Sequence, residues 1–136
     1  MNPELDGIDH INVYSRGKTA LGRQLSNFAS TPFKHPTDGD FLTVEGWWYW
    51  TMTGFDALRE LEGWECKQLG LKANLIRTHP TEEELIVTYR AKLDCNPDLK
   101  IALEQNRLPL EHYYVYGGKV VIPKEWQWTA KLWEKL

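Results

Sequence analysis

The chain has 136 residues, 42% of them hydrophobic and 26% charged, so it can bury a core and is too apolar to be disordered. Its formal net charge of −3 argues against a protein that grips nucleic acid mainly through basic charge. A small phosphorylated ligand remains compatible with this charge, because it needs only one or two local cations. We expect a single domain over residues 1–136.

Several classes of site and location are disfavoured by simple patterns. The N-terminus "MNPELDGIDHINVYS" has no apolar signal core and no stretch reaches about 18 apolar residues, which predicts no export signal, no membrane span and a cytoplasmic protein. Cys66 and Cys95 form no CxxC pair, which favours two reduced thiols over a disulfide. The four histidines have no metal-ligand spacing, so we expect no metal ion and no cofactor.

The N-terminal third predicts a strand, a loop, a hairpin and a helix, in that order. "HINVYS" alternates and is rich in strand formers, which predicts a strand over Ile11–Tyr14. The polar stretch 16–24 is expected to be a loop, and "PFKHPTDGDF" a hairpin with an Asp-Gly turn. Thr43 is typical of a helix N-cap, and the helix is expected to run to about Thr51 and to end near Gly54.

The middle of the chain is predicted to be mainly helical. "FDALRELEG" has helical spacing and is expected to stop at Gly63, and the next short helix, "WECKQLGLKANL", is expected to close at Gly70. Thr81 and Glu84 form a capping-box pattern for the best helix of the chain. Five residues of this helix are predicted to share one face: Leu85, Thr88, Tyr89, Lys92 and Leu93.

The C-terminal part predicts a helix, a hairpin and a final helix. Asn96 before Pro97 is a helix-start pattern. "LEHYYVYGGKVVIP" predicts two short strands around a Gly-Gly turn. The last 14 residues predict an amphipathic helix with Trp126, Thr129, Ala130 and Trp133 on one face. Strands and helices in this order indicate an α+β fold.

The string "TVEGWWYW" brings one acid next to four large rings. On a helix that begins near Thr43, Glu45, Trp48 and Tyr49 share a face at i, i+3 and i+4. A carboxylate held against flat rings can stabilise positive charge or exchange a proton with a ring-shaped ligand. Two plainer interpretations stand beside this one: Glu45 supports a helix start, and the rings belong to the core, as we expect for Trp47 and Trp50.

Three short strings together resemble the opening of the NADAR, or YbiA-like, family: "INVYS", "LSNFASTPF" and "DGDFLTVEGWWYW". The order and the spacing agree with the family pattern I-N-F-Y-S, L-S-N-F-x-x-x-P-F and D-G-x-x-x-x-T-x-E-H-Y-F-Q. "IVTYRAKLDCNPDLKIAL" resembles the family's R-x-K-F segment, and "LEHYYVYGG" is more loosely similar to a strand that ends in W-G-D-G.

The resemblance implies a small α+β domain and an N-glycosidase, which hydrolyses the bond between a ribose carbon and a nitrogen. Family ligands are phosphorylated ribose or ADP-ribose derivatives, including early riboflavin-pathway intermediates and ADP-ribosyl groups on guanine, so nucleic acid is expected only as a modified-base substrate. The family glutamate falls on Glu45, and the serine and asparagine of L-S-N-F fall on Ser26 and Asn27.

The departures from the family pattern concern its other polar residues. Gly46 replaces the histidine after the glutamate, and Gly117 stands at the later aspartate. Tyr49 and Met52 replace a glutamine and a lysine. The Gly- and Lys-rich loop that follows W-G-D-G in the family is shortened to "KVVIP", which would suit a divergent, phage-borne member. Four residues are candidates to stand in for the missing acid: Asp38, Asp40, Glu111 and His112.

The loop "YSRGKTALGR" adds a candidate anion site. Arg16 and Lys18 precede L-S-N-F, where they could clamp a phosphate or lie in a solvated loop. Two functions follow from the sequence. One is a hydrolase in which Glu45 is the acid or base, Ser26 and Asn27 position the ribose, and Trp48 or Tyr49 stacks the base. The other is a non-catalytic domain that binds a nucleotide, ADP-ribose or a partner protein.

Overall fold

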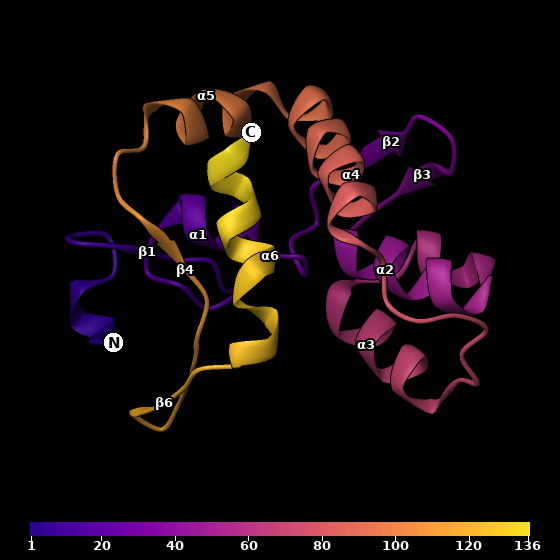
Figure 1. Ribbon diagram of the computed structural model, residues 1–136, viewed down its shortest axis with the longest axis horizontal. Helices are drawn as coiled ribbons and strands as arrows, with labels where there is room; N and C mark the ends of the chain where they lie inside the picture. Colours follow the sequence, from indigo (N-terminus) through magenta and orange to yellow (C-terminus); the bar gives the residue numbers. More distant parts are fainter.

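Three separate two-stranded sheets and a set of helices form the fold (Figure 1). The computed structural model describes residues 1–136. The helices are α1 Ala20–Leu25, α2 Val44–Thr53, α3 Gly63–Lys72, α4 Glu82–Cys95, α5 Pro97–Gln105 and α6 Gln127–Lys131. The strands are β1 Ile11–Asn12, β2 Phe33–His35, β3 Gly39–Phe41, β4 Leu110–Glu111, β5 Tyr114–Tyr116 and β6 Lys119–Val121. Helices and small sheets together confirm the α+β class. No helix has both the length and the apolar character needed to cross a membrane.

The two ends of the chain are joined by a parallel strand pair. Ile11 in β1 is in register with Leu110 in β4. The side chain of Asn12 extends the junction, because its amide nitrogen donates to the carbonyl of Tyr113 (3.0 Å) and its oxygen accepts from the Tyr113 backbone N–H (3.1 Å). Only Ile11 and Asn12 of the predicted strand Ile11–Tyr14 pair with β4. The backbone N–H of Val13 still donates to the carbonyl of Glu111 (2.8 Å).

The predicted loop over residues 16–24 is wrong in its second half. Thr19 is an N-cap whose hydroxyl accepts a hydrogen bond of 2.9 Å from the backbone N–H of Gly22, and α1 begins at the next residue. Glycine is required at position 22, because a Cβ there would lie 2.2 Å from the carbonyl oxygen of Asn12. Gly17 and Gly22 weaken the helical pattern of this stretch. Close packing against β1 explains why position 22 is a glycine.

The predicted hairpin and the first predicted helix are confirmed. Strands β2 and β3 pair antiparallel around the Asp38-Gly39 turn. The hydroxyl of Thr43 accepts from the backbone N–H of Gly46 (2.9 Å), and α2 ends at Gly54, which adopts the left-handed conformation (φ 75°).

The prediction for residues 55–73 is partly wrong. "FDALRELEG" forms only a 3-10 turn, Asp56–Arg59, and Gly63 begins α3 where it was expected to end a helix. Gly70 lies inside α3 rather than closing it. Both glycines serve packing: a Cβ at Gly63 would lie 2.6 Å from Phe28, and one at Gly70 would lie 2.1 Å from the ring of Tyr49.

Helices α4 and α5 follow the prediction. Thr81 and Glu84 form a complete capping box, and the five residues predicted to share a face of α4 are all buried. One of them, Lys92, is fully buried; its ammonium group donates to the carbonyl of Ser26 (3.1 Å) and lies 5.6 Å from the Trp133 ring centroid. Asn96 and Pro97 make the short corner between the two helices.

The C-terminal segment has the predicted hairpin and a broken final helix. Strands β5 and β6 pair antiparallel around Gly117 and Gly118, both with positive φ. The predicted continuous helix is a 3-10 turn (Lys124–Trp126), then α6, then a second 3-10 turn (Leu132–Lys135). Its predicted face is largely confirmed, because Thr129, Ala130 and Trp133 are buried.

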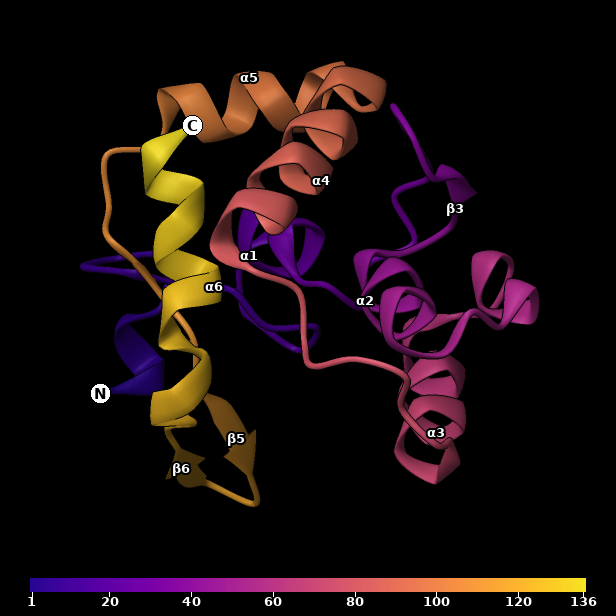
Figure 2. The ribbon, with the colours of Figure 1, turned by 45° about the vertical axis from the view of Figure 1, so that its right-hand side comes forward.

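Figures 1 and 2 show how these elements divide the molecule. Helices α2 and α3 lie on one side, and β1, β4 and α6 lie on the other, while α4 and α5 bridge them at one end. The hydrophobic core runs through both sides and includes Trp47, Tyr89 and Trp133. This division places residues from distant parts of the sequence around one cavity.

Candidate functional site

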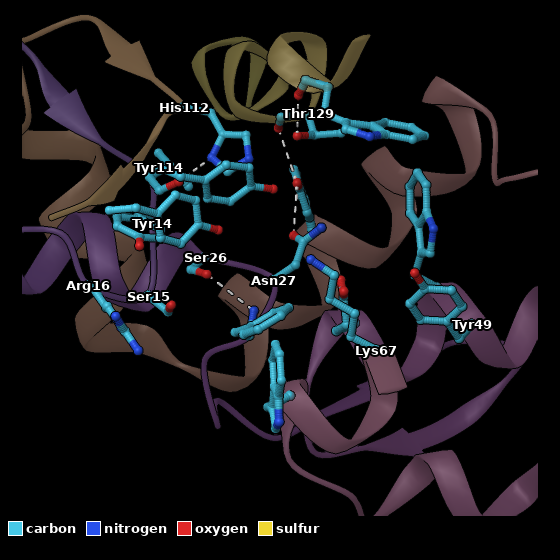
Figure 3. A pocket seen from close by; sticks show the side chains of 18 residues that line it. Tyr14, Ser15, Arg16, Ser26, Asn27, Tyr49, Lys67, His112, Tyr114 and Thr129 are labelled. Carbon is cyan, nitrogen blue, oxygen red and sulfur yellow. Dashed lines mark hydrogen bonds between the residues drawn. The ribbon is translucent and has the colours of Figure 1, made fainter. Parts of the chain in front are cut away.

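A cavity of about 280 Å³ lies where the two sides meet (Figure 3). Its walls come from five regions of the chain: the segment after β1, the "SNF" turn after α1, helices α2 to α4, the segment from His112 through β5, and the C-terminal helical segment. Eighteen residues line it, ten of them hydrophobic. Mostly apolar walls with a few polar groups are typical of small-molecule sites.

Six of the seven residues predicted from the sequence to form a site line this cavity: Arg16, Ser26, Asn27, Glu45, Trp48 and Tyr49. The seventh, Lys18, is exposed and is not part of the lining; its backbone N–H donates to the carboxylate of Asp6 (2.9 Å). The structure thus brings together residues that three separate sequence strings contribute, and it separates Arg16 from Lys18.

Glu45 is held at the cavity wall by its backbone and left free at its side chain. Its N–H donates to the carbonyl of Asn27 (2.9 Å), and the Thr43 cap fixes the first turn of α2. The carboxyl group makes no hydrogen bond or ion pair with the protein. Burial raises its pKa to about 7, and the ammonium group of Lys67 partly opposes this rise. A carboxyl group in this setting can gain or lose a proton near neutral pH.

The "SNF" turn is fixed by hydrogen bonds that leave one polar group free. The side-chain oxygen of Asn27 accepts from the hydroxyl of Tyr89 (3.2 Å), which also lies 3.1 Å from the carbonyl of Thr129. The Asn27 amide nitrogen makes no hydrogen bond with the protein, so it can donate to a ligand. The hydroxyl of Ser26 accepts from the backbone N–H of Phe28 (3.2 Å), and Ser26 is buried.

The aromatic residues of α2 divide between the cavity and the core as the helical spacing predicts. Trp48 and Tyr49 line the cavity, whereas Trp47 is only 1% exposed and donates its indole N–H to Asp38 (2.9 Å). Trp50 packs edge-to-face on Phe41, outside the cavity.

Trp48 is supported from behind by further rings. The imidazole of His79 stacks parallel to it at 5.6 Å between centroids, and Trp126 meets it edge-to-face at 5.5 Å. Packing of this kind holds a ring in one orientation, so Trp48 is a rigid part of the cavity wall.

Lys67 is a site residue that the sequence analysis missed. It lies on α3, and its ammonium group is 5.9 Å from the ring centroid of Phe28 and 6.0 Å from that of Tyr114. Its positive charge lowers the pKa of both Glu45 and His112. Nothing in the sequence near Lys67 distinguishes it from an ordinary surface lysine of a helix. Its position became evident only from the packing of α3 against α2.

Among the four candidates to replace the missing acid, only His112 lines the cavity. Asp38 is engaged by the indole N–H of Trp47, and Glu111 pairs with Lys131 at 3.0 Å. Asp40 lies in the β2–β3 hairpin, away from the cavity lining.

The two glycines that depart from the family pattern have different explanations. A Cβ at Gly46 would lie 2.4 Å from the carbonyl oxygen of Leu58, so no side chain fits there. Gly117 is at the tip of the β5–β6 turn with φ 53°, where an added Cβ would meet no atom within 4 Å, and it does not line the cavity. Position 46 therefore cannot carry a side chain in the present backbone, and position 117 lies outside the cavity lining.

Comparison of the chain with protein-family models, with curated proteins and with solved structures found no match in any of the three.

Proposed function

We propose that the protein is a hydrolase of N-glycosidic bonds, related to the NADAR family, with a phosphorylated ribose or ADP-ribose derivative as its substrate. The observation that carries this proposal is the state of Glu45. It is a carboxyl group at the wall of an aromatic cavity, with no protein partner and with a pKa raised to about 7. Desolvated acids of this kind are typical of proton-transfer sites.

Hydrolysis of a C–N glycosidic bond needs help at two places. Positive charge develops on the ribose ring as the bond to nitrogen breaks, and the departing nitrogen needs a proton. Glu45 can exchange the proton, and the free amide of Asn27 can hold a ribose hydroxyl. Trp48 offers a rigid face on which a flat base can stack.

The cations of the cavity suit a phosphate group. Arg16 and Lys67 both line it, and Lys67 has no carboxylate partner within ion-pair distance. An arginine fork and a lysine point charge are common phosphate ligands. We therefore assign anion binding to Arg16 and Lys67, with Lys18 outside the cavity as a more distant contributor.

The alternative is a non-catalytic domain that binds the same class of ligand. It is favoured by the glycines at positions 46 and 117, because the family that the sequence resembles carries polar side chains there. Under this alternative the cavity still recognises phosphate, ribose and a flat ring, but no bond is broken.

The two functions are separated by turnover measurements on the wild type and Glu45→Gln. The substrates are nucleoside 5′-monophosphates, whose bases need a proton to leave, and the readout is the released base. The amide keeps the size of the side chain but cannot exchange a proton, so we expect turnover to fall by about 10² to 10⁴-fold with little change in affinity. Glu65→Gln is the matched control, because Glu65 is exposed on α3 and does not line the cavity.

Three outcomes distinguish the possibilities. Loss of turnover in Glu45→Gln but not in Glu65→Gln supports the hydrolase. Equal turnover in the wild type and Glu45→Gln removes Glu45 from the mechanism. No turnover in any protein, combined with a ligand-induced rise in melting temperature for ADP-ribose or ribose 5-phosphate, favours the non-catalytic domain.

A further inference from the structure

His112 presents an unprotonated nitrogen to the same cavity. Its Nδ1 lies 2.7 Å from the carbonyl oxygen of Val13, which can only accept a hydrogen bond. Nδ1 therefore carries the proton, and in the neutral ring Nε2 is left with a free lone pair. Nε2 has no hydrogen-bond partner in the protein, and the ring lies at the cavity wall beside Tyr114 (Figure 3).

The backbone of His112 is fixed as firmly as its ring. The side chain of Gln127 accepts from the His112 N–H (3.1 Å) and donates to the His112 carbonyl. Tyr114 meets the imidazole edge-to-face at 5.1 Å between centroids. A residue whose backbone is fixed by Gln127, whose ring is fixed by Val13 and Tyr114, and whose Nε2 is free is pre-organised to act on something inside the cavity.

Burial and a neighbouring cation favour the neutral form of this ring. Burial is the main cause that lowers the pKa of His112 below 6.5, and the ammonium group of Lys67, on α3, lowers it further. The hydrogen bond to Val13 acts in the opposite direction. The neighbouring phenol of Tyr114 stays neutral, because burial and nearby carboxyl groups raise its pKa.

We propose that His112 is the second catalytic residue of the hydrolase, the general base that activates water opposite Glu45. The inference rests on the proposed function. Glu45 comes from α2 and His112 from the segment between β4 and β5, so the two groups approach the cavity from different elements.

The proton balance of the reaction closes with these two groups. The protonated carboxyl of Glu45 gives its proton to the departing nitrogen as the bond from the ribose carbon to nitrogen breaks. Water forms the new bond from oxygen to that carbon, and its proton passes to Nε2 of His112. The resulting imidazolium and carboxylate return to their starting states by exchange of one proton through solvent.

The test is His112→Asn, whose amide N–H can still donate to Val13 but which has no basic nitrogen. In the wild type, kcat/KM should rise with pH as His112 loses its proton, below pH 6.5, and should fall as Glu45 loses its proton, near pH 7. In His112→Asn we expect kcat to fall by about 10²-fold or more and the rise at low pH to disappear, while the fall near pH 7 remains.

His35→Asn is the matched control. His35 lies in β2, does not line the cavity, and accepts at Nδ1 from the backbone N–H groups of Thr37 (3.2 Å) and Asp38 (3.0 Å), which an asparagine oxygen can also do. It should keep both limbs of the pH profile. A wild type that turns over, with an unchanged rate and profile in His112→Asn, overturns the role of His112 alone. A wild type with no turnover on any N-ribosyl phosphate overturns the hydrolase and this inference together.

Discussion

The backbone N–H of Glu45 donates a hydrogen bond of 2.9 Å to the carbonyl of Asn27. This bond joins the first turn of α2 to the "SNF" turn, so the backbone segments that carry the Glu45 carboxyl group and the Asn27 amide are held together. Two strings that are separate in the sequence thereby form one wall of the cavity.

The stability of Glu45→Gln should depend on pH in a way that a helix-start residue would not show. The folded-state pKa of Glu45 is raised from 4.5 to about 7, so its neutral form stabilises the fold below pH 4.5, and this contribution is lost as pH rises to about 7. Gln stays neutral throughout. We expect the variant to melt higher than the wild type at pH 8, and this gain to vanish at pH 4.5.

Melting curves of wild type, Glu45→Gln and Glu65→Gln at the two pH values check this expectation. If Glu45 only supports the helix start, Glu45→Gln should lose up to about 1 kcal/mol at pH 8, because it gives up a favourable interaction with the helix dipole. The two interpretations therefore predict opposite signs at pH 8.

Lys67→Gln should weaken the binding of phosphorylated ligands. It removes a lining cation that has no carboxylate partner, and a loss of about tenfold in affinity for ADP-ribose corresponds to about 1.4 kcal/mol. Calorimetric titration of ADP-ribose into both proteins measures it. Lys72→Gln, at an exposed position of the same helix, controls for the change in net charge. Equal affinity in the two variants would contradict the assignment.

Lys92→Met should be neutral or stabilising near neutral pH, although Lys92 is fully buried. Burial lowers the pKa of Lys92 to about 7 from 10.5. The unfolded chain holds this proton more tightly, so the free energy of unfolding of the wild type should rise as the pH increases from 7 to about 10.5. Replacement of a buried charge by a packed apolar group typically raises the free energy of unfolding by about 0 to 4 kcal/mol.

The Ser26 carbonyl, which accepts from Lys92, keeps a second donor in the variant, the backbone N–H of Ala29 at 3.1 Å. Denaturant titrations at pH 7 and pH 10 test the expectation. The pH dependence should flatten in Lys92→Met and persist in Lys100→Met, at an exposed lysine of α5. Strong destabilisation of Lys92→Met at pH 7 would show that the lysine is needed for the fold.

Gly46→Ala should destabilise the protein, although alanine is the better helix former. The new Cβ would lie 2.4 Å from the carbonyl oxygen of Leu58, which is backbone and cannot rotate away. Overpacking of this kind costs about 1 to 3 kcal/mol, more than the gain of up to about 1 kcal/mol in helix propensity. Thermal unfolding measures the balance, and a variant at least as stable as the wild type would show that α2 and Leu58 can separate.

The sequence predicted those parts of the fold whose signals are local. The Thr43 cap, the Thr81 and Glu84 capping box and the Gly117-Gly118 turn each depend on residues within a few positions, and each is confirmed. Helix boundaries were predicted wrongly where a glycine is required by tertiary packing. Gly63 was expected to end a helix and begins one, because its missing side chain admits Phe28.

The part of the candidate site that lies in recognisable sequence motifs was predictable. Helical spacing separated Trp48 from Trp47 correctly, and the "LSNF" and "TVEG" strings do meet at one cavity. Lys67 has no such signal, because its approach to the cavity depends on how α3 packs against α2. Lys18 is the converse case. It lies two residues from Arg16 in the sequence, but only Arg16 lines the cavity.

The parallel pairing of β1 with β4 also bears on how the chain folds. Ile11 can complete its ladder only after Leu110 has been synthesised and has returned across the molecule. Contacts between such distant residues slow folding, because a long loop must close before they stabilise anything. Until then the cavity has no wall from residues 112–129, and the aromatic face of α2 stays exposed to other chains. Ligand binding should therefore appear late in refolding, together with the docking of the C-terminal segment.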